Sequence, residues 1–200
     1  MQTKTLRVGL TMRVVHAQGY DEPRDALAQD WRRFLDGALP QAIWILLPNL
    51  GPERIGSYCD QWDINRLIFT GGEDIGVSDS RDKTELALLD WATLKDIPVL
   101  GICRGMQLLS TWAGADLKVV ENHVCTRHVL SGELSGEVNS FHKLALSDCP
   151  ASFDIIARSE DGCIEAIRHV KKPLEGWMWH PEREWPVQIA DIQRLQRLFI

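Results

Sequence analysis

The residue best suited to nucleophilic chemistry is Cys103, which lies between two glycines in the segment Gly101-Ile-Cys-Arg-Gly105. An apolar run precedes this cysteine and an apolar helical pattern follows it, so the thiol is expected at a tight turn from a strand into a helix. Such a turn strains the backbone of its central residue and lifts the side chain clear of the sheet edge. The dipole of the following helix favours thiolate over thiol. The pattern therefore predicts a nucleophile, against the alternative that a free cysteine only fills space in the interior.

A cysteine nucleophile needs a base and a group that orients the base, and these can come from anywhere in the chain. His180 and Glu182 follow the apolar residues 177–179 and are two positions apart, so both side chains can point the same way in an extended chain. A carboxylate beside an imidazole fixes its tautomer and stabilises its charged form. We therefore predict His180 as the base and Glu182 as its orienting group. The alternative is that His180 is a turn residue before Pro181.

The other five histidines do not show the spacing of metal ligands. They have no helical i, i+4 partner and no cysteine pair beside them, so the sequence predicts neither a metal site nor a cofactor. We expect most of them to be surface residues or to make local hydrogen bonds. They are His16, His123, His128, His142 and His169.

Composition is that of an ordinary globular protein. The chain has 200 residues, of which 44% are hydrophobic and 25% charged, and we expect one domain over residues 1–200. Lys and Arg number 22 against 28 Asp and Glu, and 22 − 28 = −6, so no overall field attracts nucleic acid. The five cysteines are odd in number and lack C-x-x-C spacing, which argues against a disulfide framework and fits a reducing, cytoplasmic setting. Residues 1–10 do not resemble a signal peptide, and no apolar stretch approaches the roughly 20 residues of a membrane span.

The first half of the chain alternates between strand and helix patterns. We predict strands over 5–12, 42–47, 66–70 and 97–103, a helix that begins at Asp21-Glu22-Pro23 and runs to Leu39, and a helix over 82–95. Arg13, His16 and Tyr20 are expected on a loop, and residues 53–58 show poor periodicity. Alternating strands and helices predict a parallel sheet, so the segments after Met12, Phe69 and Ile102 should share one ligand crevice at its carboxyl edge.

The second half is mainly β in pattern. We predict that its short strands extend the sheet and form a smaller antiparallel layer at one edge, with a terminal helix over 187–199. The strand candidates are 117–120, 124–130, 137–141, 153–159, 163–170 and 175–179.

Several of these motifs together resemble the class I glutamine amidotransferase superfamily. The motifs are Gly-Ile-Cys-Arg-Gly-Met-Gln at 101–107, Gly71-Gly72, Val-Asn-Ser-Phe-His at 138–142 and His-Pro-Glu at 180–182. They come in the order of that family and cover nearly the whole chain. The resemblance implies an α/β fold of the flavodoxin-like three-layer type, with a mostly parallel central sheet. It also implies a Cys-His-Glu triad of Cys103, His180 and Glu182, which would act on a C–N bond through a thioester.

The resemblance also carries over a set of binding residues. It implies that the backbone N–H groups of Gly72 and Arg104 hold the oxyanion of the tetrahedral intermediate. Gln107 and the backbone of Ser140 and Phe141 would hold the α-amino and α-carboxylate groups of a glutamyl moiety. The implied partner is therefore a small-molecule γ-glutamyl substrate.

Residues 81–85, 138–142 and 178–184 resemble the γ-glutamyl hydrolase branch, which includes γ-glutamyl-γ-aminobutyrate hydrolase of polyamine catabolism. The segment 20–31 and the Trp-His-Pro-Glu-Arg-Glu stretch resemble a compact subgroup that includes γ-glutamyl-CDP-amidate hydrolases of bacterial capsule biosynthesis. A diphosphate leaving group would need cations at the mouth of the cleft. The candidates are Arg13, Arg24, Arg81, Lys83, Lys143 and Arg183, each with the alternative of being a solvated surface charge.

Two other functions remain open at this stage. One is a glutaminase subunit that delivers ammonia to a partner synthetase, and the other is a degenerate binding domain without activity. The sequence also leaves open whether the chain forms a homodimer.

Overall fold

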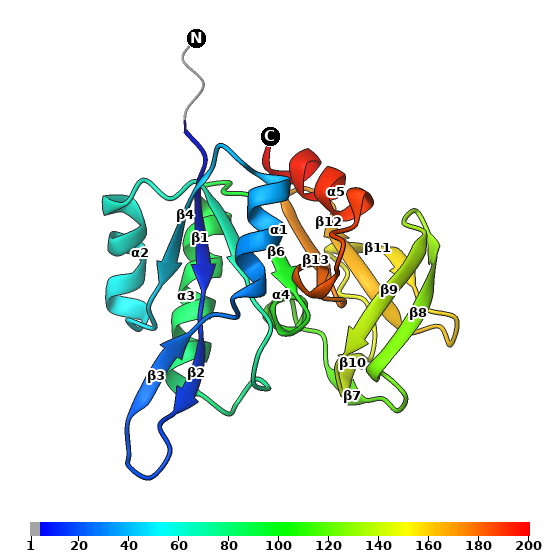
Figure 1. Cartoon of the computed structure of the whole chain (residues 1–200), viewed down its shortest axis with the longest axis horizontal. Helices are drawn as coiled ribbons and strands as arrows, with labels where there is room; N and C mark the ends of the chain where they lie inside the picture. Colours follow the sequence, from blue (N-terminus) through cyan, green and yellow to red (C-terminus); the bar gives the residue numbers. More distant parts are fainter. Residues whose placement is uncertain (1–4) are drawn as a thin grey trace.

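A nine-stranded sheet runs through the molecule, and its parallel half follows directly from the predicted alternation of strands and helices (Figure 1). The computed structural model describes residues 5–200. Residues 1–4, the start of the segment in which we expect no signal peptide, lie outside this range. The parallel strands are, in sheet order, β4 (Ile43–Leu47), β1 (Arg7–Thr11), β5 (Arg66–Phe69), β6 (Val99–Ile102) and β13 (Leu174–Trp177). In chain order of these strands this arrangement is 2-1-3-4-5, which is the flavodoxin-like order.

The remaining strands of the main sheet follow beyond β13, each antiparallel to the strand beside it. They are β12 (Ile164–His169), β11 (Phe153–Arg158), β8 (Val124–Gly132) and β9 (Gly136–Phe141). A separate antiparallel pair consists of β7 (Leu117–Val119) and β10 (Leu144–Leu146), the second of which the pattern did not predict. The predicted fold class is confirmed, and most of the expected antiparallel strands continue the central sheet.

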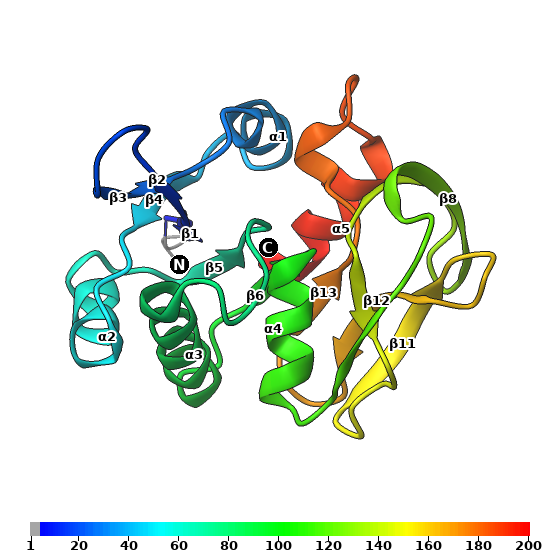
Figure 2. The same cartoon turned by 90° about the horizontal axis from the view of Figure 1, so that it is seen from below.

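Helices cover both faces of the sheet and make three layers (Figure 2). One apolar core lies under α1 (Asp30–Ala38) and α5 (Ile189–Phe199), where Trp31 and Phe34 are fully buried against β1 and β6. A second core lies on the opposite face, under α2 (Pro52–Gln61), α3 (Asp79–Leu94) and α4 (Arg104–Trp112). Because both faces are covered, β1, β5 and β6 are mostly buried, as their apolar runs indicated. The edge strand β4 differs, because Ile43, Trp44 and Leu46 are exposed and only Leu47 is fully buried.

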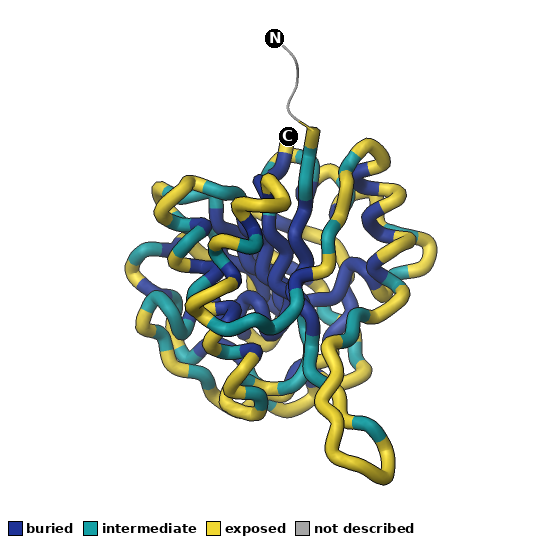
Figure 3. Tube along the Cα trace, turned by 90° about the vertical axis from the view of Figure 1, so that its left-hand side faces the viewer, coloured by how far each residue is buried: buried dark blue, intermediate teal, exposed yellow. Residues whose placement is uncertain are grey.

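The segment after β1 differs from its prediction. Residues 13–16 form β2 (Arg13–His16) and pair with β3 (Pro23–Ala26) in an exposed hairpin that projects from the sheet (Figure 3). The loop predicted for Arg13 and His16 and the helix start predicted at residues 21–23 are therefore wrong. Helix α1 begins only at Asp30, because the backbone of Pro23–Ala26 is held by cross-strand pairing, and a local capping pattern cannot compete with a formed ladder.

Helix α2 is also missing from the prediction. It carries a proline in its first turn and buries only Ile55 and Cys59, so its apolar stripe is narrow and its period is hard to detect. Among residues 5–200, no helix has the length and apolar character needed to cross a membrane.

Candidate active site

Cys103 lies at the turn from β6 into α4, with a backbone φ of +52°. A positive φ is costly for a residue with a side chain, and such strain concentrates at functional sites. The backbone N–H of Cys103 donates to the carbonyl of Trp177 on β13 at 2.7 Å, which fixes the turn to the neighbouring strand. At Gly101 an added Cβ would lie only 2.5 Å from the backbone of Gly105, so the two glycines allow strand and helix to approach closely. The thiol is 7% exposed, at the N-terminus of a nine-residue helix.

His180 and Glu182 lie beside this turn because β13 ends next to β6. The Nδ1 atom of His180 is 2.7 Å from Oε1 of Glu182, and both side chains are almost fully buried. Burial lowers the pKa of His180, but the Glu182 carboxylate and a hydrogen bond with Cys103 outweigh this effect and raise the pKa to about 9. The imidazole is therefore protonated at neutral pH, with its charge between a thiol group and a carboxylate.

Asn139 holds the backbone of His180, and sequence reasoning did not single it out. Its Oδ1 accepts from the His180 N–H at 2.9 Å, and its Nδ2 donates to the His180 carbonyl at 2.8 Å. The amide thus bonds both backbone groups of His180. Because Asn139 belongs to β9, these bonds attach the segment that carries the imidazole to that strand. Its position within the Val-Asn-Ser-Phe-His motif is the signal that could have identified it.

A pocket of about 380 Å³ opens at Cys103, on the carboxyl edge of the parallel strands. Its walls include Gln107 and Phe141, two of the residues expected to bind substrate. The Gln107 amide donates to the carbonyl of Leu144 at 2.9 Å, and the Phe141 ring lies edge-on to His180. Ser140 is fully buried and does not line the pocket, and its hydroxyl donates to the carbonyl of His123 at 2.7 Å. The other lining residues are Gly72, Glu73, Asp74, Val77, Arg104, Val124, His142 and Lys143.

Gly72 and Arg104, the two expected oxyanion donors, both border this pocket. A Cβ at Gly72 would contact the Arg81 guanidinium, so only glycine fits this loop. Arg104 turns its own side chain away into ion pairs with Glu85 and Asp82.

Arg81 is not at the mouth of the cleft, which corrects its assignment as a leaving-group contact. Its side chain is fully buried and forms ion pairs with Glu73 at 2.8 Å and with Glu85 at 3.0 Å. It also donates to the carbonyl of Thr70 at 2.7 Å, so it holds the glycine loop from below. Arg81 lies on α3, which packs under this loop, so its charge points into the protein rather than into solvent.

Replacing Arg81 with methionine is expected to lower the free energy of unfolding by about 3–5 kcal/mol, because Glu85 and Glu73 lose a partner inside the protein. Chemical denaturation measures this loss. Lys83→Met is the matched control, since Lys83 forms only an exposed pair with Asp79, and it should change the stability by less than about 0.5 kcal/mol. Equal stability of the two variants would contradict the role given to Arg81.

The other predicted leaving-group contacts divide into two groups. Arg24 and Lys83 are exposed and pair with Glu22 and Asp79, and neither lines the pocket. Lys143 lines the pocket beside Cys103. Two further cations lie next to the site: Arg13 and Arg183 border a small space of about 20 Å³ at His180, and Arg183 also covers the Phe141 ring at 4.6 Å.

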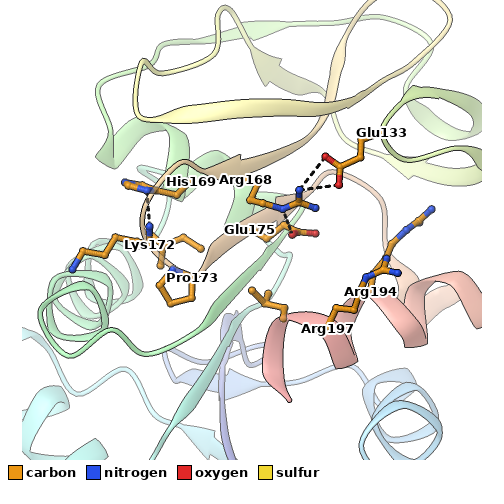
Figure 4. Close-up of a pocket in the computed structure, with 10 residues that line it drawn as sticks. Glu133, Arg168, His169, Lys172, Pro173, Glu175, Arg194 and Arg197 are labelled. Carbon is orange, nitrogen blue, oxygen red and sulfur yellow. Dashed lines mark hydrogen bonds and ion pairs between the residues drawn. The ribbon is translucent and has the colours of Figure 1, made fainter.

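A second cavity, of about 410 Å³, lies at the opposite edge of the sheet, where β13 begins and α5 passes (Figure 4). Its residues are charged, but Arg168 pairs with Glu133 and Glu175, and Arg194 pairs with Asp191. It contains no cysteine. The carboxyl edge at Cys103 therefore remains the candidate site.

One other cysteine lies near a histidine and carboxylates. Cys163 is close to His123 and Asp161, and its thiol is 3.6 Å from Oδ2 of Asp161. Burial, and then the negative charge of Asp161, raise the pKa of Cys163. A raised pKa disfavours the thiolate, so this cysteine is less suited to nucleophilic attack than Cys103, at its helix N-terminus.

Comparison with known proteins identifies a family and several relatives of this chain. Residues 57–186 match the family model described as glutamine amidotransferase class-I. A γ-glutamyl-CDP-amidate hydrolase of Campylobacter jejuni is 31% identical over 183 residues, which cover 88% of this chain and 90% of that protein. A glutamine-hydrolyzing GMP synthase subunit of Thermococcus kodakarensis is 29% identical over 138 residues, which cover 64% of this chain and 71% of that protein. The crystal structure of a glutamine amidotransferase from Thermotoga maritima has the same fold, with a TM-score of 0.65 at 17% identity over 98% of this chain and 94% of that one. The chain therefore belongs to the class I glutamine amidotransferase family, as a glutamine amidotransferase-like hydrolase.

Proposed function

We propose that this protein hydrolyses γ-glutamyl amides with Cys103 as nucleophile, His180 as base and acid, and Glu182 as the orienting carboxylate. The observation that carries the proposal is the strained turn at Cys103, beside a buried His180–Glu182 pair of 2.7 Å and at the wall of a 380 Å³ pocket. The thiolate attacks the γ-carbonyl carbon, and the backbone N–H groups of Gly72 and Arg104 stabilise the oxyanion. Removing one such donor typically costs about 10²- to 10³-fold in rate.

The two half-reactions each move one proton through His180. As the C–N bond breaks, the imidazolium gives its proton to the leaving nitrogen, and a glutamyl thioester remains on Cys103. The now neutral imidazole takes a proton from water, which attacks the thioester carbonyl. Glutamate leaves, and the thiolate–imidazolium pair is restored. The pKa of about 9 for His180 supports the first step, since the group begins protonated at neutral pH.

The charged residues around the pocket support a substrate in which a glutamyl group is joined through an amide to a group that carries negative charge. Asp74 and Lys143 both line it, and a carboxylate and an ammonium together suit the α-ammonium and a negatively charged part of one substrate. A relative that covers most of the chain is named a γ-glutamyl-CDP-amidate hydrolase. We therefore propose γ-glutamyl-CDP-amidate as the substrate, with glutamate and cytidine diphosphoramidate as products.

A direct test compares glutamate release from γ-glutamyl-CDP-amidate, γ-glutamyl-γ-aminobutyrate and glutamine. The diphosphate compound should have the highest kcat/KM. Lys143→Met should lower that kcat/KM by about 10- to 100-fold, the value of one charge-assisted hydrogen bond, and should affect glutamine hydrolysis far less. Lys83→Met, a cation outside the pocket, is the matched control and should leave all three rates unchanged. The proposal fails if none of the three compounds releases glutamate.

A second candidate is a glutaminase subunit of a two-protein synthetase. The specific observation is the similarity to the glutamine-hydrolyzing GMP synthase subunit of an archaeon over 64% of this chain. In that case glutamine would be hydrolysed quickly only after a synthetase is added. Rapid hydrolysis of γ-glutamyl-CDP-amidate by the isolated chain would exclude this candidate.

A further inference from the structure

Three of the histidines that the sequence suggested as surface or local hydrogen-bonding residues lie close together, beside a buried glutamate. His123 precedes β8, His128 lies on β8, His142 follows β9 and Glu165 lies on β12. These residues come from three separate segments of the chain and show no motif spacing, so only the folded sheet brings the segments together. His123 and His142 are 1% and 3% exposed, so these two histidines are not surface residues, and Glu165 is 0% exposed.

Several atoms of this group have no hydrogen-bond partner among residues 5–200. Both carboxylate oxygens of Glu165 are buried without a donor, and so is Nε2 of His128. A buried carboxylate without a compensating partner costs several kcal/mol. A cation between these atoms would remove that cost.

The hydrogen bonds around the two buried imidazoles indicate which ring nitrogens carry lone pairs. Nε2 of His123 is 2.8 Å from the Asp161 carboxylate, and Nδ1 of His142 is 3.1 Å from the Leu144 carbonyl. Both of these partners are acceptors, so these two ring nitrogens donate their N–H groups. The lone pairs then lie on Nδ1 of His123 and Nε2 of His142, which face each other at 3.2 Å. Each is 3.6 Å from Oε1 of Glu165.

We infer that His123, His128, His142 and Glu165 bind a zinc ion. Zinc takes imidazole nitrogen and carboxylate oxygen at about 2.0–2.1 Å in a tetrahedron, so its ligand atoms lie about 3.4 Å apart. The separations of 3.2, 3.6 and 3.6 Å among the ligand atoms of His123, His142 and Glu165 match that figure. The ligand atoms of His123, His128 and Glu165 all lie within 4.8 Å of one another. The Asp161 carboxylate and the Leu144 carbonyl orient the rings from behind, as outer partners of metal-bound histidines usually do.

A second ligand set shares His123 but fits less well. His123, Asp161 and Cys163 also lie within 4.8 Å of one another. Asp161, however, already bonds to the Ser159 hydroxyl, the Cys163 backbone and His123, and it leaves no orphaned atom there. The atoms without a hydrogen-bond partner belong to His128 and Glu165. The set of three histidines and Glu165 is therefore the one that a cation would stabilise.

The ion has a structural role next to the pocket. With all four residues as ligands, the coordination shell would be closed and would leave no position for substrate. His142 lines the Cys103 pocket, and the Leu144 carbonyl accepts from both the His142 ring and the Gln107 amide. Zinc would thus fix the chain at residues 142–144 to the sheet and keep one pocket wall in place.

The test measures metal in the full chain, purified without a polyhistidine tag from zinc-supplemented cells. We expect about one zinc per chain by mass spectrometry of the metal, and a Tm that falls when a chelator removes it. Glu165→Gln should weaken zinc binding at least about 100-fold, and added zinc should no longer raise its Tm. His16→Gln, at an exposed position, and Cys103→Ser, which removes the pocket thiol, should keep the metal.

If Glu165→Gln fails to fold, the wild-type chain still decides the question. Chelated protein loaded with Co²⁺ should show tetrahedral absorption bands without a thiolate charge-transfer band. An intense thiolate band would overturn the ligand assignment in favour of Cys163, or of Cys103 if Cys103→Ser abolishes it. Absence of zinc together with failure of the chelated chain to bind it would overturn the site altogether. These results do not depend on which amide the protein hydrolyses.

Discussion

Replacement of Cys103 by alanine is expected to lower kcat for every γ-glutamyl amide by roughly 10⁴-fold or more, as for other nucleophiles that act within a triad. The loss is large because no other thiol lines the pocket, and the thioester cannot form without Sγ. The fold should survive, since alanine keeps the Cβ and only one small, nearly buried atom is removed. Glutamate release measures the activity, and mass spectrometry of acid-quenched enzyme should detect a glutamyl adduct on the wild type alone.

A matched control comes from a second thiol. Cys149 is half-buried and outside the pocket, so Cys149→Ala should keep full activity. If Cys103→Ala remains active, or if the adduct is found on Cys163, the assigned nucleophile is wrong.

Glu182→Gln is expected to lower kcat by about 10³- to 10⁴-fold near neutral pH, the range seen when the acid of a Ser-His-Asp triad becomes its amide. Glutamine keeps the shape but removes the negative charge 2.7 Å from the His180 ring. Without that charge, burial lowers the pKa of His180 from about 9 toward or below the ordinary value of about 6.5. The leaving nitrogen then lacks its proton donor.

The pH profile separates this explanation from simple damage to the fold. In the wild type, His180 is protonated below its pKa of about 9, so activity should fall as the pH rises through that value. In Glu182→Gln the same fall should occur at least one pH unit lower. Glu160→Gln, on an exposed loop, should leave the profile unchanged. An unshifted alkaline limb in Glu182→Gln would show that the carboxylate does not act through His180.

The same shift in pKa has a consequence for stability. The folded pKa of His180 lies above the unfolded value of about 6.5, so its protonation favours the folded state. This contribution is complete below about pH 6.5 and is lost as the pH rises through about 9.

The sequence was informative where local pattern and tertiary structure agree. The apolar runs before Gly71 and Cys103 could be recognised as buried parallel strands, and the rule on carboxyl edges placed their loops at one crevice. The prediction from sequence failed where pairing between strands decides the secondary structure. Residues 23–26 have good capping chemistry for a helix, yet they pair with β2 instead.

The positions of charged and polar side chains were harder to predict from the sequence than the strands and helices. Arg81 has the sequence context of a helix start on the surface, and only the packing of α3 against the glycine loop makes it a buried residue. His123, His142 and Glu165 belong to three separate segments, so no spacing rule could bring them together. Their convergence depends on the register of the antiparallel strands, which one-dimensional patterns do not contain.

The buried ion pairs beneath Cys103 form one chain of charges. Its members alternate in sign, and it connects the glycine loop to the residue after the thiol. In order they are Glu73, Arg81, Glu85, Arg104 and Asp82. Loss of Arg81 or Arg104 removes the ion-pair partner of a carboxylate inside the protein, whereas loss of Glu73 or Asp82 leaves both arginines paired with Glu85. A disturbance at either arginine would therefore reach both the glycine loop and the residue after the thiol.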